Sequence, residues 1–110
     1  MIKPDQVSEL LKDRRSVYPT QYTGEPVSNA IIEEMLENAK WAPTHRLTEP
    51  WRFVVFSGKG IQKLASFQSE LYKEIGTANG SFDETKFQKL ATKPLMSSHI
   101  IAIGMARDEK

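Results

Sequence analysis

The sequence has no cysteine among its 110 residues. This absence excludes disulfides, cysteine-based zinc sites, iron–sulfur clusters and a thiol nucleophile, so any redox chemistry must come from a bound cofactor. Histidine is also scarce, with His45 and His99 as the two examples. They lie far apart in the sequence, and neither has a second histidine at the spacing of a helical zinc motif. We therefore expect no metal site.

Long apolar runs and a strong net charge are absent as well. No window approaches the ~18 consecutive apolar residues of a membrane-spanning helix. The opening stretch, MIKPDQVSELLKDRR, carries charges where a secretory signal needs an apolar core. We therefore expect a cytoplasmic protein without membrane association. The 15 basic and 14 acidic residues give a net charge of +1, which argues against a polyanion-binding surface, so nucleic acid is not an expected partner.

The residues that are present favour one small globular domain over residues 1–110. Apolar residues make up 39% and charged residues 26% of the chain, which is a typical soluble composition and allows a modest core. We find no internal repeat and no interdomain linker. The sequence therefore predicts a single structural unit.

Apolar periodicity predicts four helices and two strands. Ser28 is a suitable N-cap for the second helix, Gly76 a suitable end for the third, and Pro94 lies just after the fourth. The helices are expected at residues 5–15, 28–40, 59–76 and 83–92, and the strands at residues 51–57 and 99–106.

The order of these elements indicates how the two strands pair and whether they form a complete sheet. A long connection between the two strands favours parallel or split pairing over a hairpin. The apolar run at 99–106 suits a strand that is buried on both faces. Two strands alone do not make an independently stable sheet. Either a partner chain supplies further strands, or the sequence is the first part of a longer protein.

The stretch RRSVYP places Arg14, Arg15 and Ser16 together at the end of the first expected helix. Guanidinium groups match phosphate oxygens bidentately, and a serine hydroxyl adds a neutral donor, so the three residues could form an anion cradle. The alternative is a solvated helix end whose cations interact with the helix dipole. From these residues alone, both interpretations stay open.

Together with WAPTHRLTEPWRFVVFSG, residues 41–58, this stretch resembles the nitroreductase family of flavin mononucleotide (FMN) enzymes. Members of that family have a helix ending in Arg-(Arg or His)-Ser, a Pro-rich segment, a helix ending in Ala-Pro, and a loop that closes on Gln-Pro-Trp-x-Phe before a strand. The same order is found in this chain. The resemblance is greatest to the short YdjA-like branch, extends over nearly the whole chain, and includes DETKFQKLATKPLMSSHIIAIG.

The resemblance implies an α+β fold, a three-layer α-β-α sandwich formed by an intertwined homodimer with FMN in a groove at the dimer interface. Because family members are longer, this chain resembles their N-terminal portion. The implied reaction passes electrons from NADH or NADPH through flavin to a small-molecule acceptor such as a nitroaromatic or a quinone. The alternative is a noncatalytic flavin-binding or dimerisation fragment of the same fold.

The resemblance also implies which residues bind the cofactor. Arg14, Arg15 and Ser16 match the family's first flavin-binding cluster. In that cluster, Arg14 and Ser16 are expected at the phosphate and ribityl end, and one arginine also at the pyrimidine edge of the ring. Trp41 and His45 match positions that reach the flavin of the other subunit. The implied chemistry requires no catalytic protein nucleophile.

Several residues depart from the family pattern or have another interpretation. Leu47 stands where many members have an asparagine, and Glu49 replaces the usual glutamine. Trp51 and Phe53 are expected to anchor the core rather than stack on flavin. His99 lies beside two serines, but neighbouring residues of a strand point to opposite faces. We therefore interpret His99 as a polar residue at a strand entrance.

Overall fold

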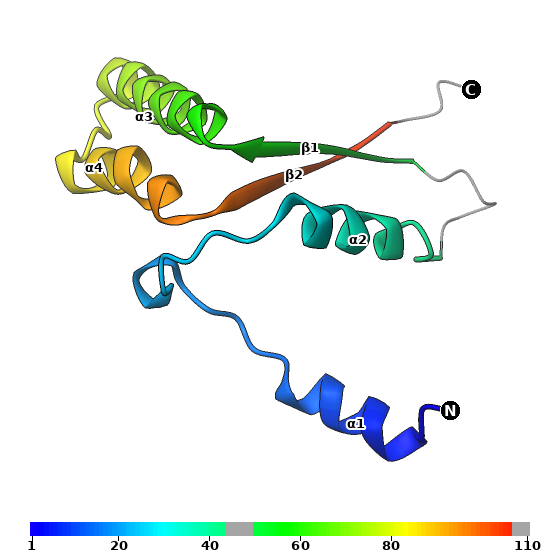
Figure 1. The fold of residues 1–110 in the computed structure, drawn as a ribbon. Coiled ribbons are helices and arrows are strands. Elements are labelled where there is room, and N and C mark those ends of the chain that lie inside the picture. The colour runs from blue at the N-terminus through cyan, green and yellow to red at the C-terminus, as the bar shows by residue number, and fades with distance from the viewer. Residues whose placement is uncertain (44–49, 107–110) are drawn as a thin grey trace.

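The computed structural model describes residues 1–43 and 50–106, in which helices alternate with two strands. This arrangement confirms the predicted α+β class (Figure 1). In chain order the elements are α1 (Pro4–Asp13), the 3-10 turn η1 (Pro19–Gln21), α2 (Asn29–Ala39), β1 (Trp51–Ser57), α3 (Lys59–Asn79), α4 (Glu84–Thr92), the 3-10 turn η3 (Lys93–Met96) and β2 (His99–Met105).

The first two helices begin within one residue of their predicted starts. Pro4 occupies the first turn of α1, where a missing N–H costs nothing, and α1 ends at Asp13. The predicted end at residue 15 was therefore wrong by two residues, since Arg14 already has extended backbone, with φ −63° and ψ 133°. At α2, the prediction is confirmed, because the Ser28 hydroxyl accepts the Ile31 N–H at 3.4 Å.

The corner between α3 and α4 differs from the prediction for a packing reason. Helix α3 continues past Gly76 and ends at Gly80, whose φ of 75° is left-handed and suits a glycine C-cap. Gly76 is buried, and a Cβ atom there would lie 3.1 Å from the Phe82 Cα. The two glycines therefore have different roles: Gly76 allows close packing, and Gly80 ends the helix.

The two strands pair antiparallel, which corrects the expected parallel or split pairing. Trp51 lies opposite Met105 and Ser57 opposite His99. The connection contains two helices, α3 and α4, which pack against each other, so the chain leaves the sheet and returns to the same end (Figure 1). A connection of this kind reverses the strand direction, whereas a single crossover helix would keep it.

The core of the described residues is small and lies mainly on α3. Ile61 and Ala65 are buried on that helix, and Ile32 is buried on α2. Strand β2 is partly covered over its first three residues and exposed from Ala102 to Met105. The prediction that this strand is buried on both faces was therefore wrong for the chain by itself, because α3, α4 and η3 cover only one end of the sheet (Figure 1).

Much apolar surface of the chain is open. The radius of gyration is 18.1 Å, whereas a compact domain of this length has about 13 Å. The accessible area is 9700 Å², against about 6,200 Å² for a compact monomer of this mass. Helix α1 stands apart from the other elements and has no buried residue (Figure 1). Within the described ranges, no helix combines the length and apolarity needed to cross a membrane.

Candidate functional site

Arg14, Arg15 and Ser16 lie in the segment that joins α1 to η1. All three are exposed, and the chain runs between the two elements as an open trace (Figure 1). Arg14 has extended backbone directly after the end of α1, and Arg15 and Ser16 follow it outside any helix or strand. Among the described residues, neither guanidinium has a carboxylate partner. Two free guanidinium groups and a hydroxyl are the donor set that a phosphate ester requires, so these residues fit an FMN phosphate.

Trp41 lies in the turn that follows α2. Its N–H donates to the Asn38 carbonyl at 3.1 Å, which continues the last turn of the helix. The indole is 83% exposed, although an unpartnered tryptophan leaves a large apolar surface in water. His45, with Leu47 and Glu49, lies outside the described residues. Of the predicted loop contacts, the structure therefore describes only Trp41.

The described part of the chain does not bring Arg14, Arg15 and Ser16 together with Trp41 in one site. Arg14, Arg15 and Ser16 precede η1, whereas Trp41 follows α2 at the other end of that helix (Figure 1). Neither of the two cavities described next is lined by any of the four residues. The anion cradle and the aromatic side chain are thus separate features of this chain.

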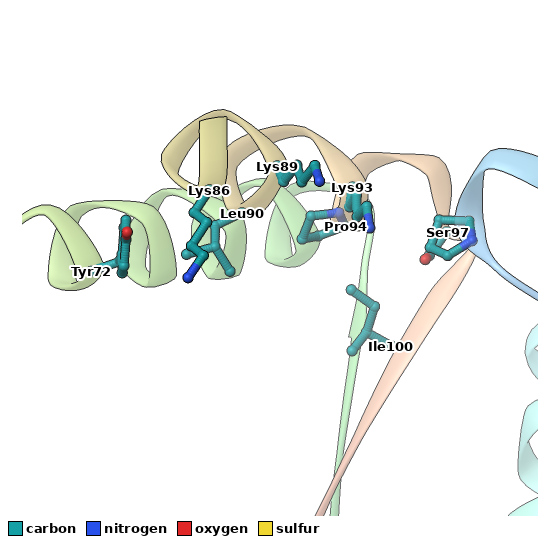
Figure 2. A pocket seen from close by; sticks show the side chains of 9 residues that line it. Tyr72, Lys86, Lys89, Leu90, Lys93, Pro94, Ser97 and Ile100 are labelled. Carbon is teal, nitrogen blue, oxygen red and sulfur yellow. The ribbon is translucent and has the colours of Figure 1, made fainter. Parts of the chain in front are cut away.

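The first cavity has a volume of about 450 Å³ and lies where α4 and η3 meet α3, β2 and Pro19 (Figure 2). Tyr72, Leu90 and Ile100 give it apolar walls, and Lys86 and Lys89 are at its edge with Lys93. In the part of the chain that the structure describes, these lysines have no carboxylate within ion-pair distance. The sequence reasoning missed this cavity, although lysines spaced by three and four residues share one helix face.

The second cavity, of about 420 Å³, begins one residue after the anion cradle. The segment from Val17 to Val27 forms one wall, and Ser98 and His99 belong to the opposite wall. Figure 1 shows this segment leading from η1 to the start of α2, close to the beginning of β2. The cavity therefore lies between the segment that carries the cradle and the sheet.

A chain of hydrogen bonds crosses the wall of the second cavity. The Val27 N–H donates to the Ser98 Oγ at 2.7 Å, the Ser98 hydroxyl lies 2.8 Å from the His99 Nδ1, and the His99 Nε2 lies 2.8 Å from the Asn29 Oδ1. An amide oxygen only accepts, so Nε2 carries the proton and Nδ1 accepts from the serine.

This geometry corrects one expectation and confirms another. His99 is the first residue of β2, as the prediction of a strand entrance required. However, the side chains of Ser98 and His99 do not diverge, because Ser98 lies in a bend before the strand and the alternation of faces begins only at His99. The partner Asn29 is 70 residues away, and no local pattern in the sequence indicates it.

Comparisons with known proteins agree on one family. The family model described as the Nitroreductase family matches residues 11–107. The match therefore includes the RRSVYP stretch and the loop before β1, on which the resemblance in the sequence rests.

Individual relatives found by sequence similarity are also named as nitroreductases. The chain is 47% identical over 51 residues to YfhC of Bacillus subtilis (strain 168), which carries a provisional NAD(P)H nitroreductase name; the alignment covers 46% of this chain and 25% of YfhC. It is 30% identical over 67 residues to the nitrobenzene nitroreductase of Ectopseudomonas oleovorans, covering 61% of this chain and 29% of that enzyme.

A solved structure extends the similarity to the whole chain. The crystal structure of a nitroreductase-like family protein from Bacillus cereus superposes with a TM-score of 0.71 and 27% sequence identity, and the match covers 100% of this chain and 55% of that one. The three matches thus cover between a quarter and little more than half of the length of these relatives.

Proposed function

Because the chain belongs to the nitroreductase family, we propose that it acts in an FMN-dependent oxidoreductase. The proposed electron donor is NADH or NADPH, and the proposed acceptor is a nitroaromatic or quinone-like small molecule. The observation that carries the proposal is the exposed donor set of Arg14, Arg15 and Ser16, inside the matched residues and without a carboxylate partner among the described ones. The name of the Ectopseudomonas relative supports a nitroaromatic acceptor.

Each cradle residue has a proposed role toward the cofactor. Arg14 and Ser16 would hold the phosphate and ribityl end. One of the two arginines would also reach the pyrimidine edge of the ring, where a positive charge stabilises the reduced cofactor. When bound, FMN supplies the hydride and electron transfer that no side chain of this cysteine-free sequence provides.

We further propose that Trp41 and His45 face the flavin of a second subunit. The support is the position of Trp41, which is exposed after α2. Neither described cavity brings Trp41 together with the cradle. A residue that cannot complete the site of its own chain can complete the site of a symmetry-related copy, since a two-fold interface repeats each contact. The proposed site is therefore formed by two chains.

The open surface supports a homodimer. The accessible area exceeds that of a compact monomer by about 3,500 Å² per chain, which is more than the roughly 1,000–2,500 Å² that each partner buries in an obligate dimer. On α1, Leu10 and Leu11 are 73% and 70% exposed. An extensive, intertwined contact with a second copy would cover part of this surface, and further chain of the kind that the longer relatives possess would cover another part.

Flavin binding by the native protein tests the proposal. We expect the protein purified from its own cells to carry flavin absorbance or to bind added FMN. Arg14→Ala should weaken FMN binding by roughly 10- to 100-fold, the value of a charge-assisted hydrogen bond. Lys63→Ala is the matched control, since Lys63 is an exposed cation on α3. Absence of flavin, or equal effects of the two substitutions, would reject the assigned cradle.

A noncatalytic flavin-binding or dimerisation role is the second candidate. The observation that favours it is the separation of the cradle from Trp41 in the described part of this chain. Steady-state oxidation of NADH or NADPH distinguishes the two candidates. Flavin binding with turnover supports the enzyme, and flavin binding without turnover in the native protein supports the noncatalytic role.

A further inference from the structure

The hydrogen-bond chain through Ser98 and His99 joins two distant parts of the sequence. Its bonds connect residues 71 and 70 positions apart. Among the residues that the structure describes, hydrogen bonds between residues 1–43 and residues 50–106 are found only here. Within the described ranges, the hydrogen bonds that join the N-terminal part, with the cradle and α2, to the sheet thus all belong to this one network.

The bonds are mutually consistent in their donors and acceptors. The Ser98 oxygen accepts the Val27 N–H. Its own proton goes to the His99 Nδ1, at 2.8 Å, in preference to the more distant Val27 carbonyl, at 3.5 Å, while the Nε2–H donates to Asn29. Each group therefore satisfies its neighbour, and removing one leaves another without its partner. Such a network acts as a unit, since the orientation of the ring depends on both of its ends.

The location of the network connects it to the proposed site. Val27 ends the segment that begins just after the cradle, and Asn29 is the first residue of α2, the helix that ends near Trp41. The same segment also packs through η1 against η3. Fixing the junction between the segment and α2 limits the movement of both groups of proposed flavin contacts.

We propose that Ser98, His99 and Asn29 are positioning residues, which hold the segment of the flavin cradle and the start of α2 against the sheet. This inference rests on the proposed function, because it assigns the network a role toward FMN. None of the three residues is assigned a contact with the cofactor. Their effect is to reduce the number of conformations that the cradle must lose when the ligand binds.

The test measures amide hydrogen exchange, histidine tautomer and FMN affinity on the native protein. In the wild type we expect a protected Val27 amide and the Nε2–H tautomer of His99 in ¹⁵N spectra. Ser98→Ala should remove the protection at Val27 while the amides of β1 and β2 stay protected. It should weaken FMN binding about tenfold, the effect of one net hydrogen bond.

Two further variants separate positioning from simple stability. Asn29→Ala should weaken FMN binding to a similar extent, and the double variant should be little weaker than either single one, because the residues act as a unit. Ser97→Ala is the control, since its hydroxyl has no hydrogen bond in the described structure. FMN affinity in this control should equal that of the wild type.

The possible failures are distinguishable. A wild type that binds no FMN overturns the proposed function, and the role inferred here with it. If folded Ser98→Ala and Asn29→Ala variants bind FMN as tightly as the wild type does, the positioning role alone is overturned. The positioning role is also overturned if the Val27 amide of the wild type exchanges as fast as in an unfolded peptide. Loss of protection throughout β1 and β2 in both variants would overturn it as well, because it would show a purely structural role.

Discussion

Replacing Gly76 by alanine should destabilise the protein, although the same change usually stabilises a helix. In the interior of a helix, alanine is favoured over glycine by about 1 kcal/mol. At Gly76 the added Cβ atom would lie 3.1 Å from the Phe82 Cα and 3.3 Å from the Phe82 nitrogen. Both are backbone atoms, so no rotation of a side chain relieves the contact.

The expected magnitude follows from these two opposing effects. Overpacking a buried position costs about 1–3 kcal/mol, and the gain in helix propensity offsets about 1 kcal/mol of that. The backbone around Phe82 has little freedom to move, because the Ser81 N–H donates to the Gly76 carbonyl at 2.9 Å and the Asp83 N–H donates to the Tyr72 hydroxyl at 3.0 Å. We therefore expect a net loss of about 1 kcal/mol in the free energy of unfolding.

Urea denaturation of the native protein measures this loss, with an unchanged m-value as the check that only stability has changed. Gly60→Ala is the matched control in the same helix, since a Cβ atom there would meet only the Phe56 Cδ1, at 3.9 Å. It should be neutral or stabilising by up to about 1 kcal/mol. If Gly76→Ala were as stable as Gly60→Ala, the packing argument for Gly76 would be refuted.

Three further substitutions test other features. Asp83→Ala removes the side chain that accepts the Thr85 N–H at 2.9 Å and should lower the free energy of unfolding by about 1 kcal/mol. In the same urea experiment, Asp83→Asn should have nearly the stability of the wild type. Trp41→Ala should weaken FMN binding by roughly two- to tenfold, the effect of a lost aromatic contact; unchanged affinity in a fluorescence titration would remove Trp41 from the proposed site. Leu10→Ser should raise the dissociation constant of the proposed dimer at least about tenfold, and sedimentation that shows no change would place α1 outside the dimer interface.

Local signals predicted most of the secondary structure. The strand at residues 51–57 was predicted with its observed bounds, because a β-branched and aromatic run is bounded by Pro50 and Gly58. Ser28 and Asp83 mark the starts of α2 and α4 because their side chains cap the helix. The sequence therefore carried enough information for element type and for all four helix starts to within one residue.

The features that were mispredicted depend on contacts between distant residues. Gly76 has the residue type of a helix end, but its packing against Phe82 decides its role. The direction of β2 depends on how α3 and α4 pack, which a count of residues between strands does not reveal. Asn29 forms its bond with His99 across 70 residues, so the network had no sequence motif.

The predicted site is a different case. Arg14, Arg15 and Ser16 were chosen by resemblance, and their exposure agrees with a ligand-binding role. The side chain of Trp41 is largely exposed. Their contacts with a cofactor stay a prediction, because the proposed site requires groups from a second chain.

The antiparallel return of the chain has a consequence for how the protein can vary. Since α3 and α4 leave the sheet and come back to the end where Ser57 lies opposite His99, the two helices can lengthen or shorten together without moving the strand register. Their tip, at Gly80 and Ser81, is exposed. Chain added in paired helical turns is therefore expected to be tolerated where the new corner again closes with a bond like that of the Ser81 N–H to the Gly76 carbonyl, because exposed loop tips accept insertions when their backbone bonds are kept. Relatives that differ in length between these two strands can keep the same sheet.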